Sequence, residues 1–407
     1  MNKIKSIIAK EIKDSRQKPT IEVELALSDS LRVVASVPSG TSTGKNEALE
    51  LRDADGIGVQ TAIKNINETI APKLKGKDPT NQKEIDDLMI ALDGTENKSN
   101  LGANAILGVS MAVCRAGAVV QKVPLYKHIA HLAGNKEKLF SPLPMFNIIN
   151  GGRHSKNELD IQEFMAVPQK KTMQENLVVG NGIFLKLKEE IKNSFAEDGL
   201  ILGDEGGFAP PITSPERALI FLRGACEGYN DVKFALDCAA SEFYKNNKYN
   251  LEGRELTRAE MLEFYKNLID NFPIISIEDP FAEEDWQGFE EITKELGKNI
   301  TIVGDDLTTT NIKKIKEAHN KKAINAVLIK LNQIGTVSET IDAINLTKSF
   351  VWKVIVSHRS GETMDNFIAD LAVGVGADMI KSGSPAKEER MIKYSRIIEI
   401  EKEMQHG

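Results

Sequence analysis

The sequence predicts an α/β protein, a modified TIM-type barrel preceded by an N-terminal α+β cap domain. The main observation is a set of six mostly apolar runs in the second half of the chain, each ending in a charged or ionisable residue. These residues are Asp237, Glu278, Asp305, Lys330, His358 and Lys381. Successive residues of this set are separated by between 23 positions (from 358 to 381) and 41 positions (from 237 to 278). A strand-plus-helix unit occupies roughly 30 residues when about 250 residues make an eight-unit barrel, so this spacing favours a barrel.

The beginning of the chain has a different pattern. Segments 4–12, 20–28 and 31–37 are rich in Ile, Val and Leu and are separated by polar or turn-forming residues. They therefore predict an antiparallel sheet. From 59 to about 120 the apolar residues recur at helical spacing. Three strands followed by helices predict an α+β domain.

Residues 134–144 combine glycine, proline and charged side chains, so we expect a boundary there, with a cap domain at 1–133 and a barrel at 134–407. Two strand-like runs follow at 145–150 and 161–167, with no room for a helix between them. The first two barrel strands are therefore expected to pair as an antiparallel hairpin. After them strands and helical patterns alternate, as a parallel barrel requires.

Composition limits the classes of function. The 407 residues carry a formal net charge of −7, and no basic cluster exceeds a few residues, which argues against a nucleic-acid surface. The N-terminus carries charges too often for a signal peptide, and we recognise no apolar stretch of about 18 residues, so we expect a cytoplasmic protein without a membrane span. The three widely spaced cysteines, Cys114, Cys226 and Cys238, predict buried thiols rather than disulfides or structural zinc.

Three of the strand-end residues are carboxylates: Asp237, Glu278 and Asp305. The C-terminal ends of barrel strands point at the substrate, and carboxylates that converge there repel one another unless a hard cation or buried basic groups neutralise them. Oxygen ligands of this kind suit Mg²⁺. Each acid taken singly fits a helix N-cap equally well, but the three together favour a metal site.

The two strand-end lysines are expected to enter the cavity beside this metal. A lysine close to a second cation loses its proton more easily, so Lys330 and Lys381 are candidate bases near neutral pH. The alternative is an ordinary lysine on the protein surface. This alternative has more weight for Lys381 than for Lys330, because the strand pattern before Lys381 is weak.

Three further residues are candidates on weaker grounds. Glu205 lies among the glycines of segment 203–207, which allow a tight path that presents the acid at a loop tip; the alternative is a solvated turn. Glu163 is a carboxylate inside an apolar run, and His154 follows a glycine pair. Segment 39–45 resembles a phosphate-binding loop, but its glycines are too close and Asn46 follows the lysine, so we interpret it as a hydroxyl-bearing lid.

Taken together, these segments resemble the enolase family, and the similarity spans nearly the whole chain. The matching stretches are Asp14-Ser15-Arg16, 37–44 with Glu47, 51–53, 101–105, 147–152 with His154, 162–165, 203–210, 276–280, 305–307, Lys330 with 332–335, 357–363 and 380–383. The resemblance implies a cap domain on a barrel whose first two strands are antiparallel.

The resemblance also implies roles at the site. Asp237, Glu278 and Asp305 would hold a first Mg²⁺, and Ser42 together with the substrate phosphate would help to hold a second. Lys330 corresponds to the general base and Glu205 to the general acid, with Glu163 and His154 supporting the acid near the leaving hydroxyl. The phosphate and carboxylate groups of the substrate would be bound by His358, Arg359, Ser360 and Lys381. Because an acid must be protonated near neutral pH, we expect a raised pKa at Glu205.

The implied reaction is the Mg²⁺-dependent dehydration of 2-phosphoglycerate to phosphoenolpyruvate, which is reversible and serves glycolysis and gluconeogenesis. The resemblance further implies a homodimer, sometimes a ring of dimers. Two alternatives stay open. One is another enolase-superfamily activity, a dehydratase or racemase acting on an acid sugar. The other is a scaffold or surface-binding role in addition to catalysis. The chain departs from the family pattern at Gln17-Lys18 and Thr41 and in its short C-terminus.

Overall fold

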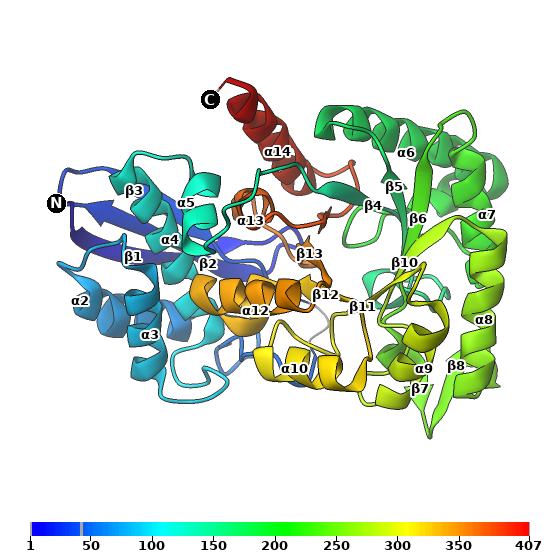
Figure 1. Ribbon diagram of the computed structural model, residues 1–407, viewed down its shortest axis with the longest axis horizontal. Coiled ribbons are helices and arrows are strands. Elements are labelled where there is room, and N and C mark those ends of the chain that lie inside the picture. Colours follow the sequence, from blue (N-terminus) through cyan, green and yellow to red (C-terminus); the bar gives the residue numbers. More distant parts are fainter. Residues whose placement is uncertain (1, 41–43, 407) are drawn as a thin grey trace.

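The computed structural model describes residues 2–40 and 44–406. The N-terminal part is a three-stranded antiparallel sheet in the order β1-β2-β3, covered by helices (Figure 1). Its strands are β1 (Ile4–Lys13), β2 (Pro19–Leu27) and β3 (Arg32–Ser36), as predicted. Its helices are α1 (Gln60–Lys64), the π-helix η1 (Asn65–Ile70), α2 (Ala71–Leu74), α3 (Gln82–Asp93), α4 (Ala103–Gln121) and α5 (Leu125–Leu132).

Strand β2 shows why this sheet forms. Ile21, Val23 and Leu25 are buried under the helices, while Glu22 and Glu24 alternate with them on the wetter face. Helix α4 lies close against this sheet, because a Cβ on its Gly108 would stand only 2.8 Å from a methyl carbon of Val23. The small residues of α4 therefore allow close packing of helix on sheet.

The expectation that no stretch of about 18 residues is apolar was wrong for α4. In the described part of the chain this one helix is long and apolar enough to cross a membrane, but 83% of its apolar window is buried inside the protein. Such burial is typical of a core helix. The cysteine prediction also needs one correction: all three thiols are free, but Cys226 is only half-buried.

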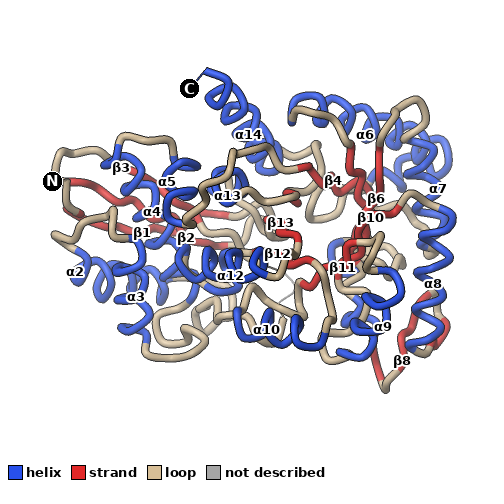
Figure 2. Tube along the Cα trace, viewed as in Figure 1, coloured by secondary structure: helices blue, strands red, loops and turns tan. Residues whose placement is uncertain are grey.

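The C-terminal part contains a closed barrel of eight strands (Figure 2). In spatial order from β4 they are β4 (Leu143–Asn150), β5 (Glu163–Pro168), β6 (Val232–Asp237), β10 (Ile274–Glu278), β11 (Thr301–Gly304), β12 (Ala326–Ile329), β13 (Lys353–Ser357) and β14 (Met379–Lys381). Strand β5 is antiparallel to both β4 and β6, and the remaining pairs are parallel. The predicted modified barrel and its antiparallel first pair are confirmed.

Helices surround this barrel, with the C-terminal helix running out beside α13 (Figure 1). They are α6 (Met173–Phe195), α7 (Pro215–Ala225), α8 (Arg258–Asn271), α9 (Trp286–Leu296), α10 (Ile312–Lys321), α11 (Leu331–Ile334), α12 (Val337–Ser349), α13 (Phe367–Val375) and α14 (Glu388–His406). The longest interval between strand-end residues, from 237 to 278, contains a small extra sheet made of β7 (Tyr244–Lys245), β8 (Lys248–Leu251) and β9 (Arg254–Leu256). This insertion explains why that interval exceeds the usual repeat.

The base of the predicted lid is fixed to the barrel mouth. Ser39 exchanges two backbone hydrogen bonds with Gly361, which follows β13, at 2.8 and 2.9 Å. Farther out, the Arg115 guanidinium of α4 pairs with Asp365, with the closest atoms 2.5 Å apart. The cap therefore stands directly over the end of the barrel that carries the charged residues.

Candidate active site

The strand registers place three acidic residues side by side at one end of the barrel. Glu278 pairs with Asp237 across β10 and β6, and Asp237 pairs with Glu163 across β6 and β5. Glu163 is the first residue of β5, but because β5 runs antiparallel, its start lies at the rim where β6 and β10 end. All three side chains are buried. The structure thus brings their carboxylates together at the barrel mouth.

The ammonium group of Lys381 lies among these carboxylates. Its Nζ is 2.8 Å from Asp237 Oδ2, 2.9 Å from Glu278 Oε2 and 3.1 Å from Glu163 Oε2. Burial favours the neutral amine, but the carboxylates outweigh burial and raise the pKa of Lys381 well above its usual value. This lysine is therefore charged and offsets part of the negative charge at the rim.

Lys330 is paired with Asp305, with Nζ 2.5 Å from Oδ2. Gln333 completes the contact by donating from Nε2 to the other carboxylate oxygen of Asp305 at 2.8 Å. Burial lowers the pKa of Lys330, yet the charge of Asp305 outweighs it and raises that pKa above its usual value. The easier loss of the proton was expected beside a bound cation; with Asp305 as the nearest charge, the proton is held more tightly.

Two groups of described side chains have ligand atoms close enough to hold a metal ion. They are His154, Glu163 and Glu205, and Asp279, Asp305 and Asp306. The predicted triad of Asp237, Glu278 and Asp305 is not one of these groups. Lys381 contacts the first two acids of the triad and Lys330 contacts the third, so lysines rather than one another are their nearest charged neighbours.

Glu205 reaches the same cavity from the glycine-rich loop that precedes α7. Asn147 Nδ2 donates to its Oε2 at 3.0 Å, and His358 Nε2 lies 3.1 Å from that oxygen. The loop passes so close to β4 that a Cβ on Gly207 would stand 2.7 Å from the side-chain oxygen of Asn150. The glycines are therefore needed to bring the acid into the cavity.

The sequence-based expectation of a raised pKa at Glu205 was wrong. Burial favours the protonated acid, but His358 and His154 outweigh it and hold the pKa of Glu205 well below its usual value. The raised pKa belongs to Glu163, where burial and the charge of Glu205 outweigh the attraction of Lys381. His154 lies between the two acids, with Nδ1 3.4 Å from Glu163 Oε1 and 3.5 Å from Glu205 Oε1. The two acids are therefore coupled, and the pKa of Glu163 is the higher of the two.

Both histidines of the site are neutral near pH 7. Burial lowers the pKa of His154, and burial lowers that of His358 to about 4. The attraction that lowers the pKa of Glu205 is that of the imidazolium forms, so the protonation of the acid is coupled to that of the two rings. The electrostatics of this side of the cavity rest on Lys381 and the two carboxyl groups.

The guanidinium of Arg359 is buried on the cap side of the cavity. Its Nη1 is 3.0 Å from Glu47 Oε2 and donates to Asn332 Oδ1 at 2.9 Å. A Cβ on Gly40, at the base of the predicted lid, would collide with this guanidinium. Ser360 accepts a hydrogen bond on Oγ from Arg16 Nη1 at 3.2 Å. Residues of the cap thus contact two of the predicted substrate-binding residues, Arg359 and Ser360.

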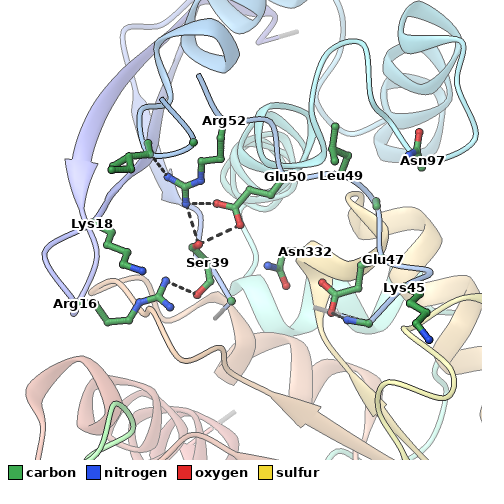
Figure 3. A pocket seen from close by; sticks show the side chains of 15 residues that line it. Arg16, Lys18, Ser39, Lys45, Glu47, Leu49, Glu50, Arg52, Asn97 and Asn332 are labelled. Carbon is green, nitrogen blue, oxygen red and sulfur yellow. Dashed lines mark hydrogen bonds and ion pairs between the residues drawn. The ribbon is translucent and has the colours of Figure 1, made fainter. Parts of the chain in front are cut away.

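Many of these side chains, but not Glu278 or Asp305, line one small cavity at the barrel mouth. Its walls are His154, Gln162, Glu163, Glu205, Asp237, Lys330, Ser357, His358, Arg359, Ser360 and Lys381. Ser42, the predicted ligand of a second metal, lies outside the described residues. A larger hollow of about 820 Å³ opens where the cap meets α11, with Ser39, Glu47 and Asn332 in its wall (Figure 3). Because Glu47 and Asn332 also contact Arg359, this hollow borders the small cavity at the barrel mouth.

Several contacting residues received no role from sequence reasoning. They are Glu47, Asn147, Gln162, Gln333 and Arg390, which contact Arg359, Glu205, Asp237, Asp305 and His358 respectively. The first four belong to the stretches that carry the family resemblance, so the signal was present. Arg390 lies in none of those stretches, and only its place in a helix with buried neighbours marks it.

Comparison with known families follows the same division as the structure. The family model described as "Enolase, N-terminal domain" matches residues 4–129, and that described as "Enolase, C-terminal TIM barrel domain" matches residues 138–407. The chain belongs to the enolase family. It is therefore a lyase, of the phosphopyruvate hydratase type.

Full-length relatives agree with the family models. The enolases of Elusimicrobium minutum and Methanocaldococcus jannaschii are each 50% identical to this chain, over 99% and 98% of it and over 97% and 95% of those proteins. The enolase of Solanum lycopersicum is 47% identical over 99% of this chain and 96% of its own length. Enolases so distant in source thus share the whole length of the chain, cap and barrel together.

Proposed function

We propose that this member of the enolase family catalyses the reversible dehydration of 2-phosphoglycerate to phosphoenolpyruvate, the step of glycolysis and gluconeogenesis that the family name denotes. The observation that carries the proposal is that a lysine and a carboxyl group, Lys330 and Glu205, line the same cavity as the cationic side chains of Arg359 and Lys381. A base, an acid and an anion-binding wall are what elimination from a phosphorylated hydroxy acid requires.

In this proposal Lys330 removes the α-proton. Burial and the charges of Arg359 and Lys381 favour the neutral amine that this step needs. Asp305 and Glu278 oppose it and keep the pKa of Lys330 above its usual value, and a cation held by these two carboxylates would offset their charge. The α-proton is hard to remove because the adjacent carboxylate is already negative, so stabilising the additional charge dominates the barrier. The fixed cations around the cavity supply part of that stabilisation.

The leaving hydroxide departs as water only if it receives a proton. We assign that step to Glu205, with Glu163 and His154 as supporting residues, because the three side chains are neighbours and because burial and the charge of Glu205 raise the pKa of Glu163. A proton held by Glu163 can reach Glu205 through the cluster as the elimination proceeds. His358, Arg359, Ser360 and Lys381 are proposed to bind the phosphate and carboxylate, with His154 and Glu163 at the substrate's hydroxyl end.

The residues present fit a divalent cation. Around the mouth the buried carboxyl groups outnumber the cationic side chains, and the charge of Asp237 adds to burial in raising the pKa of Glu278 well above its usual value. Such an excess of hard oxygen ligands favours Mg²⁺. We propose Asp237, Glu278 and Asp305 as ligands of a first ion and Ser42 as a ligand of a second that arrives with substrate. Bound Mg²⁺ would stabilise the charge that develops on the substrate carboxylate.

A coupled assay tests this function directly. With 2-phosphoglycerate and Mg²⁺ the protein should form phosphoenolpyruvate, chelator should abolish the reaction, and added Mg²⁺ should restore it. A panel of unphosphorylated hydroxy acids serves as the comparison. Turnover of one of these without turnover of 2-phosphoglycerate would replace the proposal with another enolase-superfamily activity.

Three further properties of the protein concern its domains, its location and its assembly. We propose a division into a cap at 1–133 and a barrel at 134–407, a cytoplasmic location, and a homodimer or a larger assembly of dimers. Limited proteolysis, cell fractionation and light scattering, respectively, would test them. A pull-down with a catalytically inactive preparation would test a scaffold or surface-binding role in addition to catalysis.

A further inference from the structure

One face of the C-terminal helix α14 presses on the active-site loops. Arg390, Lys393 and Tyr394 share this face at helical spacing, and each is at most 1% exposed. Lys393 Nζ lies 2.8 Å from Glu362 Oε2 in the loop after β13, and the Tyr394 hydroxyl donates to the carbonyl of Gly383, just after β14, at 3.0 Å. The helix therefore braces the segments that carry His358, Arg359, Ser360 and Lys381.

Arg390 makes the most direct contact of the three. Its Nη1 is 2.5 Å from His358 Nδ1 and donates to the carbonyl of Arg359 at 2.6 Å. Its Nη2 donates to the carbonyl of Ser360 at 2.7 Å and to that of Asp204 at 3.3 Å. One buried guanidinium thus joins the loop after β13 to the loop that carries Glu205.

This contact fixes the tautomer of His358. A guanidinium has only donors, so the Nδ1 that it contacts must act as the acceptor, and the proton of the neutral ring must lie on Nε2. Nε2 is the atom that lies 3.1 Å from Glu205 Oε2. Burial, followed by the charge of Arg390, lowers the pKa of His358, while Glu205 and Glu362 act in the opposite direction.

The packing leaves the pair little room to move. Gly383 lies against both side chains at a φ of +77°, and a Cβ there would stand 3.0 Å from Arg390 Cδ and 3.1 Å from His358 Cε1. The backbone at Gly383 thus helps to hold the guanidinium against the imidazole.

We propose that Arg390 is a positioning residue for the reaction: it fixes His358 as the neutral tautomer with its proton on Nε2, and it ties the loop of Glu205 to the loop of Arg359 and Ser360. His358 then presents an N–H donor beside Glu205 and does not compete with the acid for a proton. The contribution to turnover rests on the proposed function, whereas the tautomer can be measured in the absence of turnover.

The test compares Arg390→Met and Arg390→Lys with Arg396→Met, which removes another arginine of α14 that is paired with Asp370 away from the cavity. The protein is labelled with ¹⁵N-histidine, and the resonances of His358 are assigned from their loss in His358→Asn. We expect the unmodified protein and Arg396→Met to show a protonated Nε2 and an unprotonated Nδ1. Arg390→Met should show a mixture of tautomers or a protonated ring at neutral pH, and Arg390→Lys, which keeps a charged donor, should restore part of the Nε2–H form.

With 2-phosphoglycerate, Arg390→Met should lower kcat by about 10²-fold, the loss expected when catalytic groups shift by about 1 Å, and Arg396→Met should leave kcat unchanged. An unchanged His358 tautomer in Arg390→Met would overturn the proposal, whatever the loss of activity, because the role would then be structural only. If that variant does not fold, the same comparison is made with Arg390→Gln, whose shorter and neutral side chain cannot reach both loops, and a His358 spectrum and kcat identical to those of the unmodified protein would overturn the proposal. A protein with the expected tautomers but no turnover would instead refute the proposed function.

Discussion

Lys330 and Asp305 form a buried ion pair across the ends of β12 and β11, with Nζ 2.5 Å from Oδ2. The pair joins the proposed base to a proposed metal ligand, so the charge state of one depends on the other. Removing Asp305 would leave the lysine charge buried without its main partner, which is strongly destabilising in general. Variants that test the metal site are therefore better made at a different ligand.

Glu278 is the better position for that test. Glu278→Gln should weaken Mg²⁺ binding by at least about 10²-fold, because loss of a ligand should cost no less than loss of an outer-shell partner. The fold should survive, since Lys381 keeps its contacts with Asp237 and Glu163. Calorimetric titration measures the affinity, with Glu295→Gln on the outer surface as the matched control. Equal Mg²⁺ affinity in the two variants would remove Glu278 from the metal site.

Gly40→Ala should impair substrate binding without a metal defect. The added methyl would collide with the guanidinium of Arg359 and displace it from Glu47 and Asn332. A displacement of about 1 Å costs roughly 10²-fold, so kcat/KM should fall by about that factor. The control is Gly253→Ala, between β8 and β9, where a Cβ would meet nothing within 4 Å; its φ of +71° makes the variant a control for backbone strain outside the cavity. Steady-state kinetics in which both variants behave alike would show that the lid base does not position Arg359.

The burial of His128 should lower the free energy of unfolding in acid, independently of the active site. Burial lowers the pKa of His128 to about 4. Its Nδ1 lies 3.0 Å from Gln121 Oε1. The unfolded chain protonates this group at a pKa of about 6.5, so the stability that the neutral ring contributes is present above pH 6.5 and is lost as the pH falls toward 4. At pH 5 the loss should be about 2 kcal/mol.

Urea unfolding at pH 7 and pH 5 measures this effect. His128→Gln should lose less stability than the unmodified protein between the two pH values, by about the 2 kcal/mol stated above. His131→Gln, at an exposed histidine of the same helix α5, should keep most of the acid sensitivity, because it removes only the smaller cause of the lowered pKa and leaves the burial of His128 intact. An identical pH dependence in all three proteins would show that His128 is protonated in the folded state.

Much of the fold could be predicted from local pattern. The alternation of buried and wetter residues in β2 and the apolar runs that end at Asp237 and Glu278 correspond to strands with nearly the expected bounds. The short interval before residue 161 was enough to predict the antiparallel pair β4–β5. What pattern could not predict was the burial of α4, because composition alone does not distinguish a core helix from a membrane-spanning one.

The protonation states could not be predicted, because they depend on distances between segments far apart in the sequence. Glu205 was expected to carry the raised pKa, but two histidine rings lie beside it and the raised pKa belongs to Glu163. The pKa of Lys330 is raised by Asp305, which stands 25 positions earlier in the sequence. Arg390 had no motif around it, since its role depends on how α14 packs against the loop after β13.

The most direct test of the account separates the base from the acid by following exchange of the substrate α-proton with deuterated solvent. In Lys330→Ala that proton cannot be removed, so both dehydration and exchange should collapse. In Glu205→Gln the base remains, so dehydration should fall by roughly 10² to 10⁴ while exchange, measured by mass spectrometry of recovered 2-phosphoglycerate, should survive. Retained exchange in Lys330→Ala together with lost exchange in Glu205→Gln would contradict the assignment and reverse the two roles.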